Sequence, residues 1–597
     1  NGQIYLQLDS ADLAAWRAWI DLPLELTQGA GAVRSWLTFS NNELSAISAD
    51  VRLSGVLTRL RANLPQLELN TVAGWLSWKR LPSGYELSTQ RLALTGGGTA
   101  LPQADLLLRV TSDKQGVQQG QLQANVLNLA SLVMLADRLP LADEVRAQLL
   151  RFSPEGSVYD LTFKWQGALP APARYSARGR FELLSFKQVD KWPGVSGLSG
   201  HADGNELGGT LHVSGQAAHF ELPQVFAAPI DFETLTAQMS WNRLSGRTEM
   251  RFHNLSFANA DGAGTAFGSY RTAEGGRGDI DLTGTLTRAD ARAVPRYIPI
   301  NELQKVKAWL ARAVVTGHSN DVRFKVKGRL EDFPFAREDR GIFQVAAKVS
   351  GGTLDYAERW PRIENIEGEF QFRGARLDFV ARHGYINGVK LGPVTGEIPD
   401  LKARPEILVI RGEAEGPSAD FLGFIAKSPV TDMIERFSEG MQASGAGRLA
   451  LTLTLPLGQL ESSKVAGTYV FNNNRVVLER ELPPLEQASG RIEFTESSAH
   501  LPALSATFLG GPLSASAQAQ RDAATRVTLQ GRINADQMRK AGAPAWMQHL
   551  RGASDWRGSL TLRKKAPELV IESNLQGLSS SLPAPFAKSA AESVALR

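Results

Sequence analysis

Cysteine is absent from the 597 residues of this chain. Its absence excludes disulfide scaffolds, thiolate zinc sites, iron–sulfur clusters and cysteine nucleophiles. A long chain without thiols is also typical of an oxidising compartment, where a stray cysteine would form unwanted disulfides.

Long apolar runs are lacking as well. No stretch of 18 apolar residues occurs, so the sequence predicts no transmembrane helix within it. The first residues, Asn1 to Leu6, contain no initiator methionine, basic leader or apolar core of a signal peptide. We therefore expect the chain to be a piece of a longer protein, with any membrane anchor outside it.

An excess of charge of one sign is missing too. Lys and Arg total 65 and Asp and Glu total 61, which leaves a formal net charge of +4. No stripe of basic residues is visible, so the sequence predicts no nucleic-acid partner.

Catalytic motifs are also missing. The sequence contains no GxSxG, HExxH, Walker-type glycine loop or DxDxDG calcium loop. The closest histidines, His201, His212 and His219, would share a face of a sheet only by chance of register. We expect no catalytic residue, no metal and no cofactor, and predict that the protein is not an enzyme.

Apolar and polar residues alternate along much of the chain, for example from Leu449 to Leu455 and from Phe343 to Val349. This period of two is typical of a β-strand with one apolar face. Turn signals separate such runs, at Gly351-Gly352, Asn472 to Asn474, Pro82 to Gly84 and Gly510-Gly511. The pattern predicts short antiparallel strands joined by hairpins.

Two longer repeats accompany the strands. The element Trp192-Pro193-x-Val195-x-x-Leu198-x-Gly200 recurs from Trp360 to Gly368 and, more weakly, from Leu482 to Gly490. Its proline predicts the start or the edge of a strand, because proline cannot donate to a ladder. Amphipathic helices, each followed by a strand, are predicted near 11–20, 128–151, 300–315, 419–437 and 534–550, with the second interrupted at Pro140. They suggest one elongated β body of four units, 1–170, 171–335, 336–460 and 461–597.

The apolar face of so much β-structure must be buried somewhere. Periodicity favours a sandwich, in which two sheets cover each other. The alternative is a sheet curled into a trough with an open apolar lining, which would be a liability unless it meets a ligand.

Several segments resemble a known family. They resemble segments of the YhdP family of AsmA-like proteins of Gram-negative envelopes. The segments are Tyr297-Ile298-Pro299, the helix with Trp309 to Ala313, Gly317-His318, Asp321-Val322, Lys327-Gly328, Asp332 to Phe335, and the element from Trp360 to Gly368. The resemblance covers most of the chain and is strongest from about 290 to 460. The sequence departs from the family pattern in lacking its N-terminal membrane helix, and full-length members of the family are longer than this chain.

The resemblance implies a mostly β fold, an elongated antiparallel sheet curled into an open apolar groove with short amphipathic helices between repeats, as in TamB and the bridge-like lipid transfer proteins. It also implies phospholipid transport through the periplasm between the inner and outer membranes, with components of both membranes as partners and an inner-membrane anchor outside this chain. These implications shift the expectation from sandwich to groove.

The candidate lining is the set of apolar residues in the clearest alternations, with passive contact to acyl chains as their role. The set is Leu161, Phe163, Val322, Phe324, Val326, Phe343, Val345, Phe370, Phe372, Leu377, Phe379, Leu449, Leu451, Leu453, Leu455, Tyr469, Phe471, Ile492 and Phe494. Ordinary core packing beneath a helix is the alternative for each of them.

Two other functions stay open. An envelope scaffold or outer-membrane assembly factor would pair its exposed strand edges with a partner's β-strands. An envelope hydrolase would need a converging polar site, which the sequence does not reveal.

Overall fold

The computed structural model describes residues 2–15, 25–96, 99–190, 192–300, 304–335, 337, 339–480, 482–519, 525–540, 544–562 and 568–597. The chain divides into two compact units. The first comprises Asn1–Arg288, Arg296–Gln304 and Lys325–Phe333, and the second comprises Ala289–Pro295, Lys305–Phe324 and Pro334–Arg597. Each unit is described by itself.

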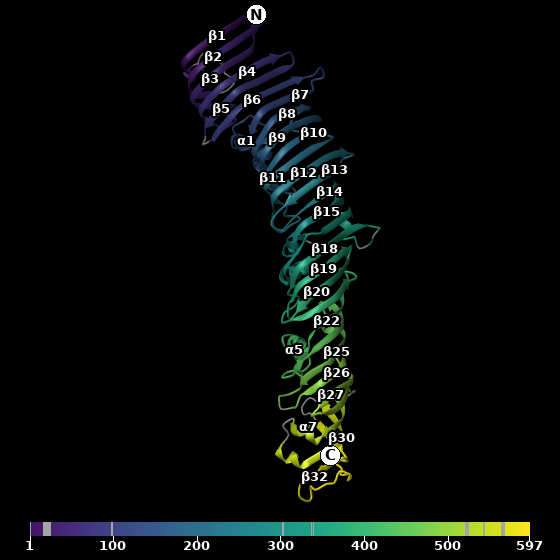
Figure 1. Cartoon of the computed structure of the whole chain (residues 1–597). Helices are drawn as coiled ribbons and strands as arrows, with labels where there is room; N and C mark the ends of the chain where they lie inside the picture. Colours follow the sequence, from purple (N-terminus) through teal and green to yellow (C-terminus); the bar gives the residue numbers. More distant parts are fainter. Residues whose placement is uncertain are drawn as a thin grey trace. The chain divides into compact units, whose positions relative to one another are not determined.

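The first unit is built from long antiparallel strands, and each strand from β1 to β14 pairs with the next (Figure 1). The strands are β1 (Gly2–Asp12), β2 (Glu25–Ser40), β3 (Glu43–Arg59), β4 (Leu67–Leu81), β5 (Gly84–Gly96), β6 (Thr99–Ser112), β7 (Gln118–Asn128), β8 (Glu155–Gln166), β9 (Arg174–Phe186), β10 (Gly194–Asn205), β11 (Gly208–Glu221), β12 (Ile230–Leu244), β13 (Arg247–Ala258), β14 (Gly262–Arg271) and β15 (Asp279–Asp290). Helices α1 (Leu129–Leu135) and α2 (Asp143–Phe152) connect β7 to β8. The last two residues of β15, and the first two of the helix α3 (Val294–Tyr297) that follows it, belong to the second unit.

The second unit has the same architecture. Its elements are α4 (Gln304–Ala313), β16 (Val314–Ser319), β17 (Val322–Arg329), β18 (Gly341–Leu354), β19 (Ile363–Arg373), β20 (Arg376–Ile386), β21 (Val389–Ile398), β22 (Glu406–Pro417), α5 (Ser418–Ala426), α6 (Val430–Met433), β23 (Gln442–Ser444), β24 (Ala446–Leu457), β25 (Lys464–Val477), β26 (Leu485–Thr495), β27 (Ala499–Phe508), β28 (Gly511–Ala519), β29 (Thr525–Asn534), α7 (Ala535–Lys540), β30 (Leu550–Leu562), β31 (Glu568–Ser573) and β32 (Leu578–Ser580). Antiparallel pairing runs from β18 to β22, passes directly to β24, and continues to β31.

The mostly β, antiparallel architecture with short helices is confirmed, with differences in detail. The strands are longer than expected, since β3 alone has 17 residues against a usual length of about five or six. Four of the five predicted helical regions contain helices, and Pro140 lies between α1 and α2 as predicted. In the region 11–20, residues 11 and 12 belong to β1 and 16–20 lie outside the described residues. The division into four units stays a prediction.

Bulges interrupt most strands at one point. Two of the turns predicted from the sequence are such bulges, so these two predictions were wrong. Gly351-Gly352 lies inside β18 and Asn472 to Asn474 lies inside β25. Gly351 (φ 61°) and Asn473 (φ 55°) adopt the left-handed conformation, and the pairing register shifts at both places. A left-handed residue inserts an extra position into one strand and bends it, so these signals mark bends within strands instead of chain reversals.

The same device explains the Trp-Pro repeat. Its three copies open β10, β19 and β26, as the proline predicted. The second of its two central variable positions is Gly197, Asn365 or Gln487, and all three have a left-handed backbone. The bulge turns residues three apart, such as Val195 and Leu198, onto one face, and both belong to one apolar cluster.

Replacement of Asn365 by valine is expected to lower the free energy of unfolding by about 1–2 kcal/mol, because a β-branched residue resists the left-handed conformation. Replacement by glycine is the matched control, and we expect it to leave stability unchanged or slightly higher. Equilibrium denaturation of the two variants measures the difference. Equal stability of both variants would contradict the role given to the bulge.

Candidate functional site

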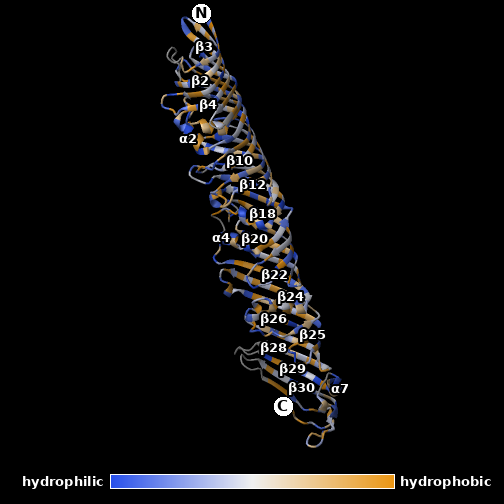
Figure 2. Cartoon of the chain, turned by 90° about the vertical axis from the view of Figure 1, so that its left-hand side faces the viewer, coloured by the Kyte–Doolittle hydropathy of each residue, from blue (hydrophilic) through white to orange (hydrophobic). Residues whose placement is uncertain are grey.

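The strand register places the apolar residues of neighbouring strands on one face of the sheet, here called the apolar face. In the second unit one unbroken row of paired residues crosses seven strands from β18 to β25. It consists of Ala347, Phe370, Phe379, Gly396, Ile410, Leu453 and Val465. Because directly opposed residues in a ladder share a face, the row is apolar over its whole width. Figure 2 shows the corresponding alternation of hydrophobic and hydrophilic residues along the strands.

Most of the predicted lining residues of the second unit lie on this face. Val345 pairs with Phe372, which pairs with Leu377. Leu455 lies opposite Leu408. Further pairs are Leu449 with Tyr469, Tyr469 with Ile492, Leu451 with Gly467, Gly467 with Phe494, and Gly447 with Phe471. Phe343 lies two residues before Val345, and its ring centroid is 6.5 Å from that of Phe372.

The first unit repeats the arrangement with different residues. Leu161 lies opposite Ala124, and Phe163 lies opposite Leu122 on one side and Ala177 on the other. Strand β17 is divided between the units, with Val322 and Phe324 in the second and Val326 in the first. The three residues alternate along the strand and therefore share one of its faces.

Eighteen of the nineteen predicted residues are half-buried, and Val322 is buried, 9% exposed. The chain as a whole exposes 35689 Å². A compact monomer of its mass, 64.7 kDa, would expose roughly 20,500 Å², so the observed area is about 1.7 times larger. A face-to-face sandwich would bury these side chains instead of leaving them partly exposed.

Several aromatic rings lie over glycines on the neighbouring strand. An ideal Cβ on Gly467 would be 2.2 Å from the ring of Phe494, and one on Gly396 would be 2.0 Å from the ring of Phe379. An ideal Cβ on Gly120 would likewise be 1.9 Å from the ring of Trp165, and one on Gly447 would be 2.1 Å from the Tyr469 hydroxyl. A ring that fills the space of a missing side chain lies close to the sheet and therefore projects less far above the apolar face.

Short helices cover parts of the apolar face. In the second unit α5 lies beside β22 and β23, and its Phe421 ring meets Tyr469 edge-on at 5.1 Å (Figure 1). The Ser418 hydroxyl is 2.7 Å from the Tyr469 hydroxyl and also bonds the buried Asn474. Burial beneath this helix raises the pKa of Tyr469. Tyr469 is therefore a lining candidate that packs under a helix.

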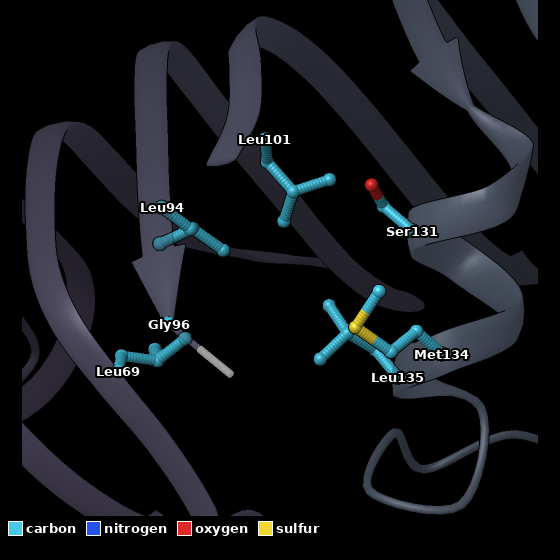
Figure 3. A pocket seen from close by; sticks show the side chains of 7 residues that line it. All are labelled: Leu69, Leu94, Gly96, Leu101, Ser131, Met134 and Leu135. Atoms are coloured by element: carbon cyan, nitrogen blue, oxygen red, sulfur yellow. The ribbon is translucent and has the colours of Figure 1, made fainter. Parts of the chain in front are cut away.

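Helix α1 covers the face of the first unit in the same way. Met134 and Leu135 of α1 face Leu69, Leu94 and Leu101 of β4 to β6 across a cavity of about 10 Å³ (Figure 3). A space of this size holds at most one water molecule, so an acyl chain does not fit between α1 and the strands.

Sequence reasoning missed part of the apolar face. Phe181, Leu198 and Leu235 are among the most buried side chains of the first unit. In the second unit Leu513 and Trp556 are among the most buried. Bulges break the period of two beside Phe181 and Leu198. Leu198 could have been found, because it occupies a fixed apolar position of the Trp-Pro repeat.

The opposite face is polar and crossed by ion pairs. Arg376 contacts both Asp378 and Glu397, and these contacts raise the pKa of Arg376 and lower the pKa of each carboxyl group. The rings of His201 and His212 stack at 4.4 Å, whereas His219 pairs with Asp231. Among the described residues no three His, Cys, Asp or Glu side chains converge as a metal site would require.

A family model described as YhdP protein matches residues 1–597. The chain belongs to the YhdP family. It is 22% identical, over 621 aligned positions, to a protein of Escherichia coli (strain K12) named intermembrane phospholipid transporter YhdP. That alignment covers all of this chain and 48% of the relative, so the chain spans about half of the relative's length. No solved structure matches the chain, and no helix in the described part of the YhdP-family chain has the length and apolarity to span a bilayer.

Proposed function

We propose that this chain carries phospholipids between the inner and outer membranes of a Gram-negative envelope, with their acyl chains along the apolar face. The observation that carries the proposal is the unbroken apolar register of β18 to β25, most of whose residues are only partly buried and over which no second sheet lies in the described part of the chain. The name of the Escherichia coli relative supports the substrate class.

The energetics favour such a path. Moving a 16-carbon acyl chain through water costs roughly 13 kcal/mol, at about 0.8 kcal/mol per CH₂. An apolar wall removes most of this cost, and the headgroup stays hydrated at the open side, so no charge is desolvated. Transport of this kind needs no catalytic residue and no cofactor. We place the protein in the periplasm, with membrane components at both ends and an inner-membrane anchor outside this chain.

Native mass spectrometry of the purified chain tests the proposal. We expect phospholipid adducts, and we expect transfer of fluorescent phospholipid from donor to acceptor vesicles when the chain is added. A chain that carries no lipid and does not accelerate transfer would refute the proposal.

The scaffold alternative finds no support in the interior strands. Strands such as β11 and β24 are hydrogen-bonded on both sides, so they present no free edge to a partner.

A further inference from the structure

The face opposite the apolar face carries a cluster of aromatic rings in the first unit. The ring centroids of Tyr5 and Trp36 are 5.2 Å apart, and those of Trp36 and Trp75 are 5.0 Å apart. Trp36 lies on β2 beside Leu37, and Leu37 pairs with Ile47 on the apolar face. The three rings therefore point away from the proposed lipid path. We call them the aromatic platform.

The platform lies over β3. Trp36 and Trp75 belong to β2 and β4, whose backbones are roughly 9.6 Å apart because β3 separates them. Their rings approach to 5.0 Å only by leaning over β3, where the opposed residues are the small Ser48 and Asp50. Within the described part of the chain neither indole N–H makes a hydrogen bond.

A polar trough continues the row from the platform. Trp75 pairs with Gln90 on β5. On the next strands the paired residues are Leu107 of β6, Gln123 of β7, Thr162 of β8 and Arg178 of β9, each opposite the one before it. These strands, β5 to β9, border a shallow trough of about 440 Å³ that is largely open to solvent. Its polar lining includes Gln90, Asp105, Gln123, Asp160, Thr162 and Arg178. From Trp36 on β2 to Arg178 on β9 the row crosses seven strand spacings, roughly 34 Å along the sheet, and Tyr5 on β1 lies one strand further.

Within the trough Asp105 accepts a hydrogen bond from the Arg91 backbone N–H and Asp160 pairs with Arg180, but four other polar side chains have no described partner. The side chains of Gln90, Gln123, Thr162 and Arg178 form no hydrogen bond or ion pair among the described residues. By contrast, Arg109 on a neighbouring part of the same face is paired with Glu86. Hydrogen-bonding groups that converge on a trough without being used internally are available to a ligand.

We propose that the aromatic platform and the polar trough bind an oligosaccharide strand. A pyranose ring has apolar C–H faces, which stack on aromatic rings, and hydroxyl edges, which bond to amide, carboxylate and guanidinium groups. The length of the row suits several sugar units. An extended peptide would instead pair with a free strand edge, and β2 to β9 offer none because each of them is paired on both sides. The second edge of β1, which carries Tyr5, has no partner strand among the described residues, but it lies only at the end of the row. A nucleic acid would need a dense basic patch, which the described part of the row does not have.

Calorimetric titration of the full chain with chitotetraose, and with muramidase-released glycan strands of peptidoglycan, tests this inference. The double variant Trp36→Ala/Trp75→Ala should bind at least tenfold more weakly, whereas Trp36→Phe/Trp75→Phe should stay within about threefold of the parent. Gln123→Ala/Arg178→Ala should weaken binding at least fivefold. Lipid transfer by all these variants should be unchanged, because none of the substituted residues lies on the apolar face.

Trp546→Ala is the matched control, because Trp546 is 51% exposed but lies in the second unit. Its affinity should equal that of the parent chain. The inference is overturned if the parent chain binds neither glycan at millimolar concentration, or if the platform and trough variants bind like the control. If only the platform variants lost affinity for the glycan, the trough would not be part of the proposed site.

Discussion

Replacement of Leu451 by aspartate is expected to reduce phospholipid loading about 100-fold while the chain stays folded. Leu451 lies opposite Gly412 on one side and Gly467 on the other, so it supplies much of the apolar surface at its position. A hydrated carboxylate there would displace an acyl chain over roughly four CH₂ groups, which costs about 3 kcal/mol at 0.8 kcal/mol each. Such a difference corresponds to a factor of about 100. Native mass spectrometry and vesicle-to-vesicle transfer both measure it.

The neighbouring Thr452 offers a matched control. It precedes Leu453 on the same strand and lies opposite Arg411 and Ala466, on the other face. Thr452→Asp introduces the same charge one residue away, and we expect parental lipid loading. Equal loading of Leu451→Asp and Thr452→Asp would show that acyl chains do not follow this part of the apolar face.

The second large effect on lipid transfer is expected from substitution of the glycines that lie beneath aromatic rings. In Gly467→Val the new Cβ would occupy the position of the Phe494 ring, at 2.2 Å. The backbone blocks the ring from below, so the ring must turn outward into the space above the apolar face. Overpacking of this kind costs typically about 1–3 kcal/mol of stability. We expect the displaced ring to obstruct the path and to reduce transfer at least tenfold.

A double variant separates obstruction from misfolding. Gly467→Val combined with Phe494→Ala removes the ring and should restore transfer, whereas Phe494→Ala alone should change it little. Gly416→Ala is the control glycine, because a Cβ there would meet its nearest neighbour at an ordinary 3.5 Å. If Gly467→Val transferred lipid like Gly416→Ala, the rings would not determine the width of the path.

Much of the fold could be predicted from the sequence because a strand with one apolar face has a period of two. The runs around Phe343, Phe370 and Leu449 show this period, and the register places all of them on one face. The bends could not be predicted in this way. Gly351 and Asn473 resemble turn residues locally, and whether a left-handed residue reverses the chain or bends a strand depends on the neighbouring strand that pairs across it.

The sequence by itself determined the mostly β class, the strand faces, four of the five helical regions and the absence of thiol chemistry, since these depend on residue type and local spacing. The tertiary structure decided which apolar residues are half-exposed and which lie under a helix, as Tyr469 lies under α5. It also decided that Phe494 and Phe379 lie over glycines, and that Trp36 and Trp75 meet across β3. Each of these contacts joins residues on different strands, and only the register of the folded sheet brings them together.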